Sequence, residues 1–219
     1  MENERDYLEL ERLSQKLKIP VLSTHIQVTA TLNGRITDKF RGRCHTWNRN
    51  YWNWIFMAPT YLPWVSTNFG AGYISLKRTD GTVVGQAAGT YPSMIPGLIN
   101  NSNYGIVVGT GSGAEDLEGY QLTTPVIHGT NAGNLSHRAQ AATTQAYTAG
   151  TKTWKGTLTR LFDNLSGGTI VITETAIKAY LGAQVSYYMM CRDLLGTPVS
   201  VLNNGVLTVT YEITLILPG

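Results

Sequence analysis

The chain has 219 residues, of which 42% are hydrophobic and 14% are charged, and its formal net charge is +3. The hydrophobic fraction supports one domain with a real core and excludes wholesale disorder. The charged fraction is well below the roughly 25% of ordinary soluble domains, and uncharged surface tends to be covered by a partner. A surplus of +3 is also small for a dedicated nucleic-acid binder, so composition argues against nucleic acid as a partner.

Residues 4–18 predict one amphipathic helix. Leu10, Leu13 and Leu17 recur at i, i+3 and i+7. Acidic residues come early and lysines come late, which complements the helix dipole, and Pro20 ends the pattern. We therefore expect residues 1–20 to form a helical arm with the only helix of the chain. Its apolar stripe needs a cover, and docking on its own domain or on a neighbouring subunit are both open.

From Val21 onward the pattern changes to the period of two that is typical of strands. Ile26 and Val28 alternate with polar residues, and Asn33-Gly34 is a turn signal. Further strands are expected over 73–76, 83–84, 106–108, 152–162, 169–175, 183–192 and 206–217, with turns at 79–82, 164–168, 198–199 and 203–205. The predicted fold class is mainly β, a β-sandwich with one N-terminal amphipathic helix and long loops, and residues 21–219 form its single domain.

A Trp-rich, loop-rich insertion is expected around residues 45–104. It holds four of the five tryptophans, Trp47, Trp52, Trp54 and Trp64, and it follows a basic stretch of Arg35, Lys39, Arg41, Arg43 and Arg49. The segment from Arg35 to Trp64 could be core aromatics with solvated arginines, a subunit interface, or a site for nucleic acid or glycan. The charge-free runs 50–76 and 81–114 are broken by Pro, Asn and Gly, so no membrane insertion is expected.

Motifs that would carry chemistry are weak. Residues 109–114 spell G-x-G-x-x-A, but the next segment is too short for the helix that binds a dinucleotide, and its acidic residues would repel phosphate. The four histidines form no short ligand pair, and Cys44 and Cys191 are expected to be reduced and buried. We therefore expect no catalytic residue, no cofactor and no metal site, and the chain is not expected to be an enzyme.

The C-terminal half resembles a recurrent type of structural protein from tailed bacteriophages. The segments that carry the resemblance are 105–111, 119–122 with His128-Gly129, 162–170, 173–175, 191–195, 198–201 and 207–213, and together they span residues 105–219. The resemblance implies a non-enzymatic subunit of the virion that is assembled in the host bacterial cytoplasm. It implies a place in the tail or neck, such as a collar, adaptor, nozzle or baseplate ring. A capsid decoration protein is the alternative place.

A virion subunit of this kind would act by assembling with copies of itself and with other virion proteins. We expect Arg41 and Arg43 of one subunit to meet Glu115 and Asp116 of the next, because one chain then carries both complementary patches. The candidate interface residues are Leu10, Leu13, Leu17, Arg41, Arg43, Trp47, Trp52, Trp54, Trp64, Glu115 and Asp116. The rival function is a glycan- or DNA-binding module that uses the segment from Arg35 to Trp64.

Overall fold

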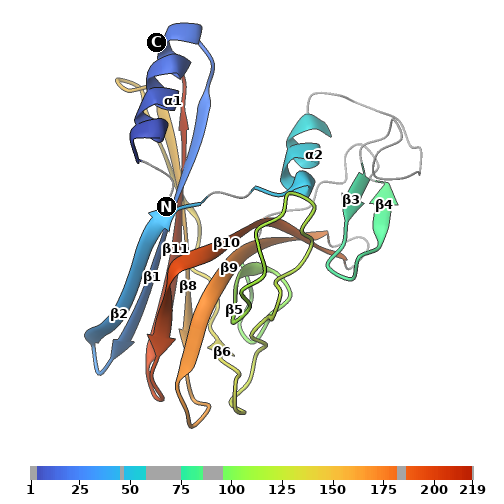
Figure 1. Cartoon of the computed structure of the whole chain (residues 1–219), viewed down its shortest axis with the longest axis vertical. Helices are drawn as coiled ribbons and strands as arrows, with labels where there is room; N and C mark the ends of the chain where they lie inside the picture. Colours follow the sequence, from blue (N-terminus) through green and yellow to red (C-terminus); the bar gives the residue numbers. More distant parts are fainter. Residues whose placement is uncertain (1–3, 45–46, 58–74, 86–95, 182–185, 219) are drawn as a thin grey trace.

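The computed structural model describes residues 4–44, 47–57, 75–85, 96–181 and 186–218. In chain order its elements are α1 (Glu4–Leu17), β1 (Val21–Leu32), β2 (Arg35–Arg43), α2 (Arg49–Met57), β3 (Ser75–Lys77), β4 (Val83–Gly85), β5 (Gly105–Gly109), β6 (Ser136–His137), β7 (Thr144–Thr148), β8 (Thr153–Asp163), β9 (Ile170–Leu181), β10 (Ser186–Val201) and β11 (Val206–Ile216). The predicted mainly-β, sandwich-like fold is confirmed (Figure 1).

The larger sheet has the strand order β2-β1-β11-β8, and both β6 and β7 pair with the outer edge of β8. The alternation of apolar and polar residues explains the register between β1 and β11. Val28 lies opposite Val209 and Ile26 lies opposite Tyr211, and all four side chains are buried on one face. The turn from β1 to β2 uses Asn33 and Gly34 at φ of 52° and 76°, the left-handed backbone that the Asn-Gly signal predicts.

The smaller sheet, β10-β9-β5, packs on the larger one to make the core. Ile172 and Val199 from this sheet share one buried cluster with Val28 and Val209. The turn predicted at Pro198-Val199 is wrong. Both residues lie within β10, where the register with β9 shifts between Leu194 and Val199, and such an irregularity accommodates a proline that cannot donate a ladder hydrogen bond.

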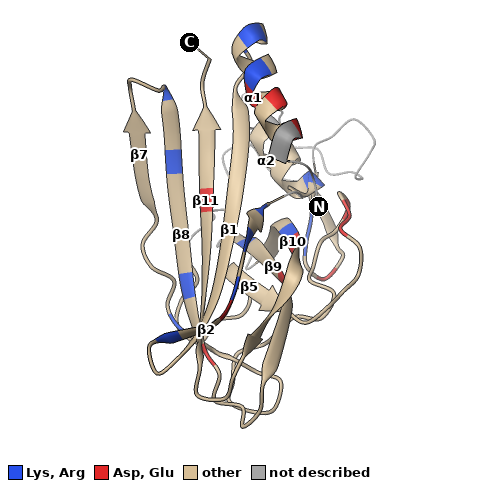
Figure 2. Cartoon of the chain, turned by 60° about the vertical axis from the view of Figure 1, so that its left-hand side comes forward, with Lys and Arg blue, Asp and Glu red and all other residues tan. Residues whose placement is uncertain are grey.

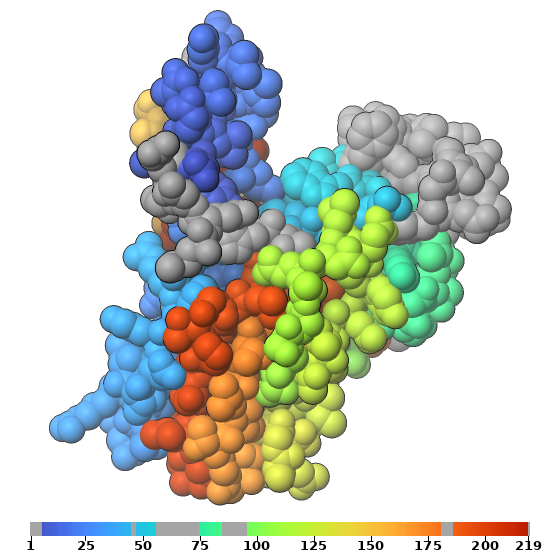
Figure 3. Space-filling model, viewed as in Figure 1, coloured from blue at the N-terminus to red at the C-terminus, as the bar shows by residue number. Residues whose placement is uncertain are grey.

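Helix α1 stands at one end of the molecule, where the larger sheet continues past the smaller one (Figures 1 and 3). Its ends agree with the prediction to within one residue. The Arg43 guanidinium links the helix to the sheet. It lies 4.2 Å from the centre of the Tyr7 ring of α1 and donates a 2.9 Å hydrogen bond to Ser23 Oγ of β1. Ser23 points away from the core face of β1, so α1 covers the outer face of the sheet.

The prediction of a single helix is wrong, because α2 forms inside the Trp-rich insertion. Asparagine side chains fasten it to its surroundings. Asn50 Nδ2 donates to the carbonyl oxygens of Lys77 and Met189, at 2.8 and 3.1 Å, and Asn53 Nδ2 donates to Ser75 O at 2.8 Å. The predicted hairpin around 79–82 is confirmed as the connection between β3 and β4. Residues 58–74 and 86–95 of the insertion lie outside the described residues.

Candidate assembly surface

The apolar stripe of α1 faces solvent rather than the domain. Leu10 is 48% exposed and Leu17 is 60% exposed, whereas Leu13 is half-buried. The side that faces the sheet carries Tyr7 and the buried Ser14, whose Oγ donates to Ile19 O. The helix therefore docks through a small, partly polar contact, and most of the predicted stripe is left uncovered by the described part of the chain.

A second apolar surface lies on the opposite face of the same sheet. Directly opposed residues of antiparallel strands point to one face, so Trp154, Leu215 and Leu22 lie side by side on that face, where Leu22 packs half-buried against the core. Trp154 is 46% exposed, and its ring centroid lies 5.1 Å from that of Tyr147, which is also 46% exposed. The surface is hollowed by about 290 Å³, and the hollow is lined by Thr143, Gln145, Trp154, Lys155, Gly156, Leu158, Ile213 and Leu215.

The two edges of the larger sheet differ in charge. All five residues of β7 are exposed, and the strand contains neither a charged residue nor a proline. The opposite edge, β2, carries Arg35, Lys39, Arg41 and Arg43. Charged edge strands resist pairing with other chains, whereas a flat uncharged edge invites it. Figure 2 shows β7 and α1 on opposite sides of the same end of the sheet, with the basic β2 lower down.

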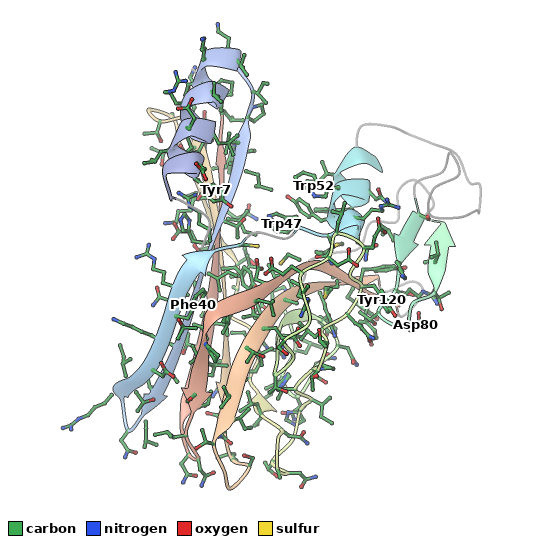
Figure 4. All side chains as sticks on the ribbon, viewed as in Figure 1. Tyr7, Phe40, Trp47, Trp52, Asp80 and Tyr120 are labelled. Carbon is green, nitrogen blue, oxygen red and sulfur yellow. The ribbon has the colours of Figure 1, made fainter. Side chains whose placement is uncertain are left out.

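The Trp-rich segment mostly serves the core. Trp47 and Tyr51 are buried with ring centroids 3.9 Å apart, and Trp54 packs half-buried against the same core cluster. Trp52 is 48% exposed, and its Nε1 donates a 3.1 Å hydrogen bond to Trp47 O (Figure 4). Trp64 lies outside the described residues. The cations of β2 and these aromatic rings lie on different elements.

The charged groups that we expected to pair between subunits have contacts within the chain. Glu118 forms a 2.6 Å ion pair with Arg49, and Glu115 Oε1 accepts a 2.7 Å hydrogen bond from Leu194 N. Asp116 Oδ1 accepts from Glu118 N at 3.0 Å. Arg41 and Asp116 are exposed, whereas Arg43 and Glu115 are half-buried. Pairing of Arg41 and Arg43 with a neighbour stays a prediction, but the neighbour would compete with these internal partners.

The glycine-rich turn after β5 holds an internal carboxylate. Glu174 is fully buried on β9, and its carboxylate accepts hydrogen bonds from the backbone N–H groups of Gly111, Thr123 and Thr124. Arg192 completes the site with a 2.7 Å ion pair from Nε to Glu174 Oε2. A Cβ on Gly109 or Gly111 would lie 2.5 or 2.6 Å from Glu174 Oε1, so the close approach of the chain requires these glycines. The G-x-G-x-x-A pattern thus has a structural role here.

Arg160 is an anchor that the sequence did not reveal. Its side chain is fully buried on β8 and donates five hydrogen bonds to backbone oxygens, those of Leu98, Asn101, Tyr104, Ile106 and Arg138. Burial lowers the pKa of Arg160 to about 10, so the guanidinium stays charged at neutral pH. The segment before and within β5 is thereby fixed against the larger sheet.

One histidine and both cysteines lie buried within the described residues. His137 is buried, and burial lowers its pKa from 6.5 to about 4. Cys44 and Cys191 are both buried and free, as predicted. They lie next to each other and to Asp193, and Cys44 Sγ donates a 2.9 Å hydrogen bond to Asp193 Oδ2. Burial raises the pKa of the Cys44 thiol.

Comparison with known protein families, curated proteins and solved structures yields no match to this chain. Within the described residues, no helix is both long enough and apolar enough to cross a membrane.

Proposed function

We propose that the chain is a structural subunit of a bacteriophage particle, in the tail or neck, and that it acts by assembling with copies of itself. The observation that carries this proposal is the presence, at one end of the fold, of two apolar surfaces that the described residues leave uncovered. One is the stripe of α1, with Leu10 and Leu17 outward, and the other is the hollow beside β7, with Trp154 and Tyr147 at its rim. The resemblance of residues 105–219 to structural proteins of tailed phages supports a phage particle as the location of the chain. It also supports the tail or neck as the place within that particle.

The positions of the two surfaces favour a ring. Helix α1 and strand β7, which borders the hollow, lie on opposite sides of the same end of the larger sheet (Figure 2). The α1 stripe of one copy can therefore meet the hollow of the next while both copies stand upright. Such a contact joins two different surfaces, and it closes into a ring when the rotation between copies allows it. The uncharged β7 edge is compatible with this contact, because it brings no like charges to the junction.

Cross-linking between copies tests this arrangement. Two single variants, Leu17→Cys and Gln145→Cys, are mixed and treated with a short bifunctional maleimide. Head-to-tail contact predicts a cross-linked dimer in the mixture and little in either variant alone. A matched mixture of Leu165→Cys and Gln145→Cys should give none, because Leu165 lies in the turn between β8 and β9. Efficient dimers from Gln145→Cys alone would instead indicate two-fold pairing of β7 edges and would contradict the ring.

The rival function is a binding module for DNA or glycan. Trp52 is the exposed aromatic ring among the described tryptophans of the Trp-rich segment, and Arg41 is an exposed cation of β2. Titration of the chain with duplex DNA at two salt concentrations distinguishes the functions. Binding that weakens steeply with salt and disappears in the variant Arg41→Glu would favour the DNA module over the structural subunit.

A further inference from the structure

The two cysteines of the chain meet in the core although 146 residues separate them. Cys44 follows β2 at the edge of the larger sheet, and its backbone N–H donates a 2.8 Å hydrogen bond to Thr24 O. Cys191 lies on β10 in the smaller sheet, two residues before Asp193, so both side chains leave the same face of the strand. This contact could not be predicted from the sequence, because the two cysteines show no ligand spacing.

The ligand atoms of this cluster are close and enclosed. Cys44 Sγ, Cys191 Sγ and an Asp193 carboxylate oxygen all lie within 4.8 Å of one another, and all three residues are buried. Zinc binds thiolate sulfur at about 2.3 Å and carboxylate oxygen at about 2.0–2.2 Å, so tetrahedral ligands lie about 3.5 Å apart. The three groups therefore need shifts of only about 1 Å to surround one ion.

From this geometry we infer that Cys44, Cys191 and Asp193 form a binding site for a thiophilic divalent cation of the zinc class. The ligand chemistry suits such an ion, because two sulfurs favour zinc over magnesium or calcium, which prefer oxygen alone. Binding releases the two thiol protons to water, and two thiolates and one carboxylate then hold the cation without any oxidation or reduction. The fourth position is open to water or to another group of the chain.

The position of the site gives the ion a structural role. One ligand comes from the larger sheet and two come from the smaller sheet, so the cation would join the two layers of the sandwich. Next to the cluster, the bridge between Trp47 and Cys191 continues toward α2. A cation there would stabilise the folded chain by linkage, since an unfolded chain does not preassemble the three ligands. This inference is independent of the assembly surface.

Native mass spectrometry of the full chain tests the site. The chain is purified with a phosphine reductant, stripped with a chelator, and incubated with one equivalent of zinc. The expected result is one zinc per chain and a higher melting temperature. With cobalt in place of zinc, we expect the near-ultraviolet absorption of thiolate-to-cobalt charge transfer. Either wild-type measurement overturns the proposal if it shows no bound metal.

Variants identify the ligands. Cys44→Ser, Cys191→Ser and Asp193→Asn should each weaken zinc binding at least tenfold in competition with a chromophoric chelator. Glu212→Gln, which removes an exposed carboxylate that pairs with Lys155, should leave the affinity unchanged. Unchanged affinity in the double variant Cys44→Ser/Cys191→Ser would overturn the site. So would a chain that, without reductant, loses the mass of two hydrogens and forms a Cys44–Cys191 disulfide in preference to taking up zinc.

Discussion

Replacing Leu10 and Leu17 together by glutamine should weaken assembly while the subunit stays folded. The two side chains are 48% and 60% exposed, so roughly half of each is available for burial against a neighbour. Full burial of a leucine contributes about 1.5–3 kcal/mol, so the two exposed halves contribute about 1.5–3 kcal/mol together. At about 1.4 kcal/mol for each factor of ten, the association constant should fall roughly 10- to 100-fold.

Sedimentation equilibrium measures that association constant, and urea unfolding measures the stability of the subunit. Glutamine keeps the helix propensity of α1, so the free energy of unfolding should change by less than about 0.5 kcal/mol. Leu98→Gln/Leu165→Gln is the matched control, because these leucines are 62% and 49% exposed on loops away from α1. Equal weakening of association in the control would contradict this prediction, as would unchanged association in the α1 variant or unfolding of its domain.

Three further predictions concern the interior. Arg192→Met should destabilise the fold by about 3–5 kcal/mol in urea unfolding, because it leaves the Glu174 carboxylate buried without its ion pair, whereas Lys155→Met removes only an exposed pair and should cost less than about 1 kcal/mol. Gly111→Ala should cost about 1–3 kcal/mol, because the added Cβ would lie 2.6 Å from Glu174 Oε1, and Gly168→Ala, which meets nothing within 4 Å, should leave the melting temperature unchanged. Burial lowers the pKa of His137 to about 4, so the unfolded state binds a proton at this residue more tightly than the folded state does. The contribution of neutral His137 to the free energy of unfolding is therefore complete above about pH 6.5, and about 3 kcal/mol of it should be lost as the pH falls toward 4. His137→Asn should remove that part of the pH dependence in urea titrations between pH 4 and 7, and an unchanged profile would show that His137 does not cause it.

Local patterns predicted the elements that they specify directly. The leucine spacing and Pro20 gave α1, the alternation of Ile26 and Val28 gave β1, and Asn33-Gly34 gave its turn. Helix α2 was missed although part of its signal was present, because Tyr51 and Trp54 lie at i and i+3 within it. The helical spacing was overlooked because aromatic residues occur at so many positions of this segment, and aromatic side chains are only moderate helix formers.

Contacts between distant segments could not be predicted from spacing. Glu174 meets the glycines after β5 because β9 and β5 pair within the smaller sheet. Arg160 meets the carbonyl oxygens of residues 98–106, and Cys44 meets Cys191, because the two sheets pack together. One of the two parts of the candidate assembly surface was predicted from the sequence. The α1 stripe was predicted, but the hollow beside β7 depends on where the smaller sheet ends, which no local pattern encodes.

Electron micrographs of the purified wild-type chain test the central claim most directly. Head-to-tail contact between the α1 stripe and the hollow beside β7 predicts closed rings of uniform diameter, with α1 at the junction between neighbouring copies. Isolated particles of the size of one 24.0 kDa chain, at high protein concentration and under several salt conditions, would contradict the account.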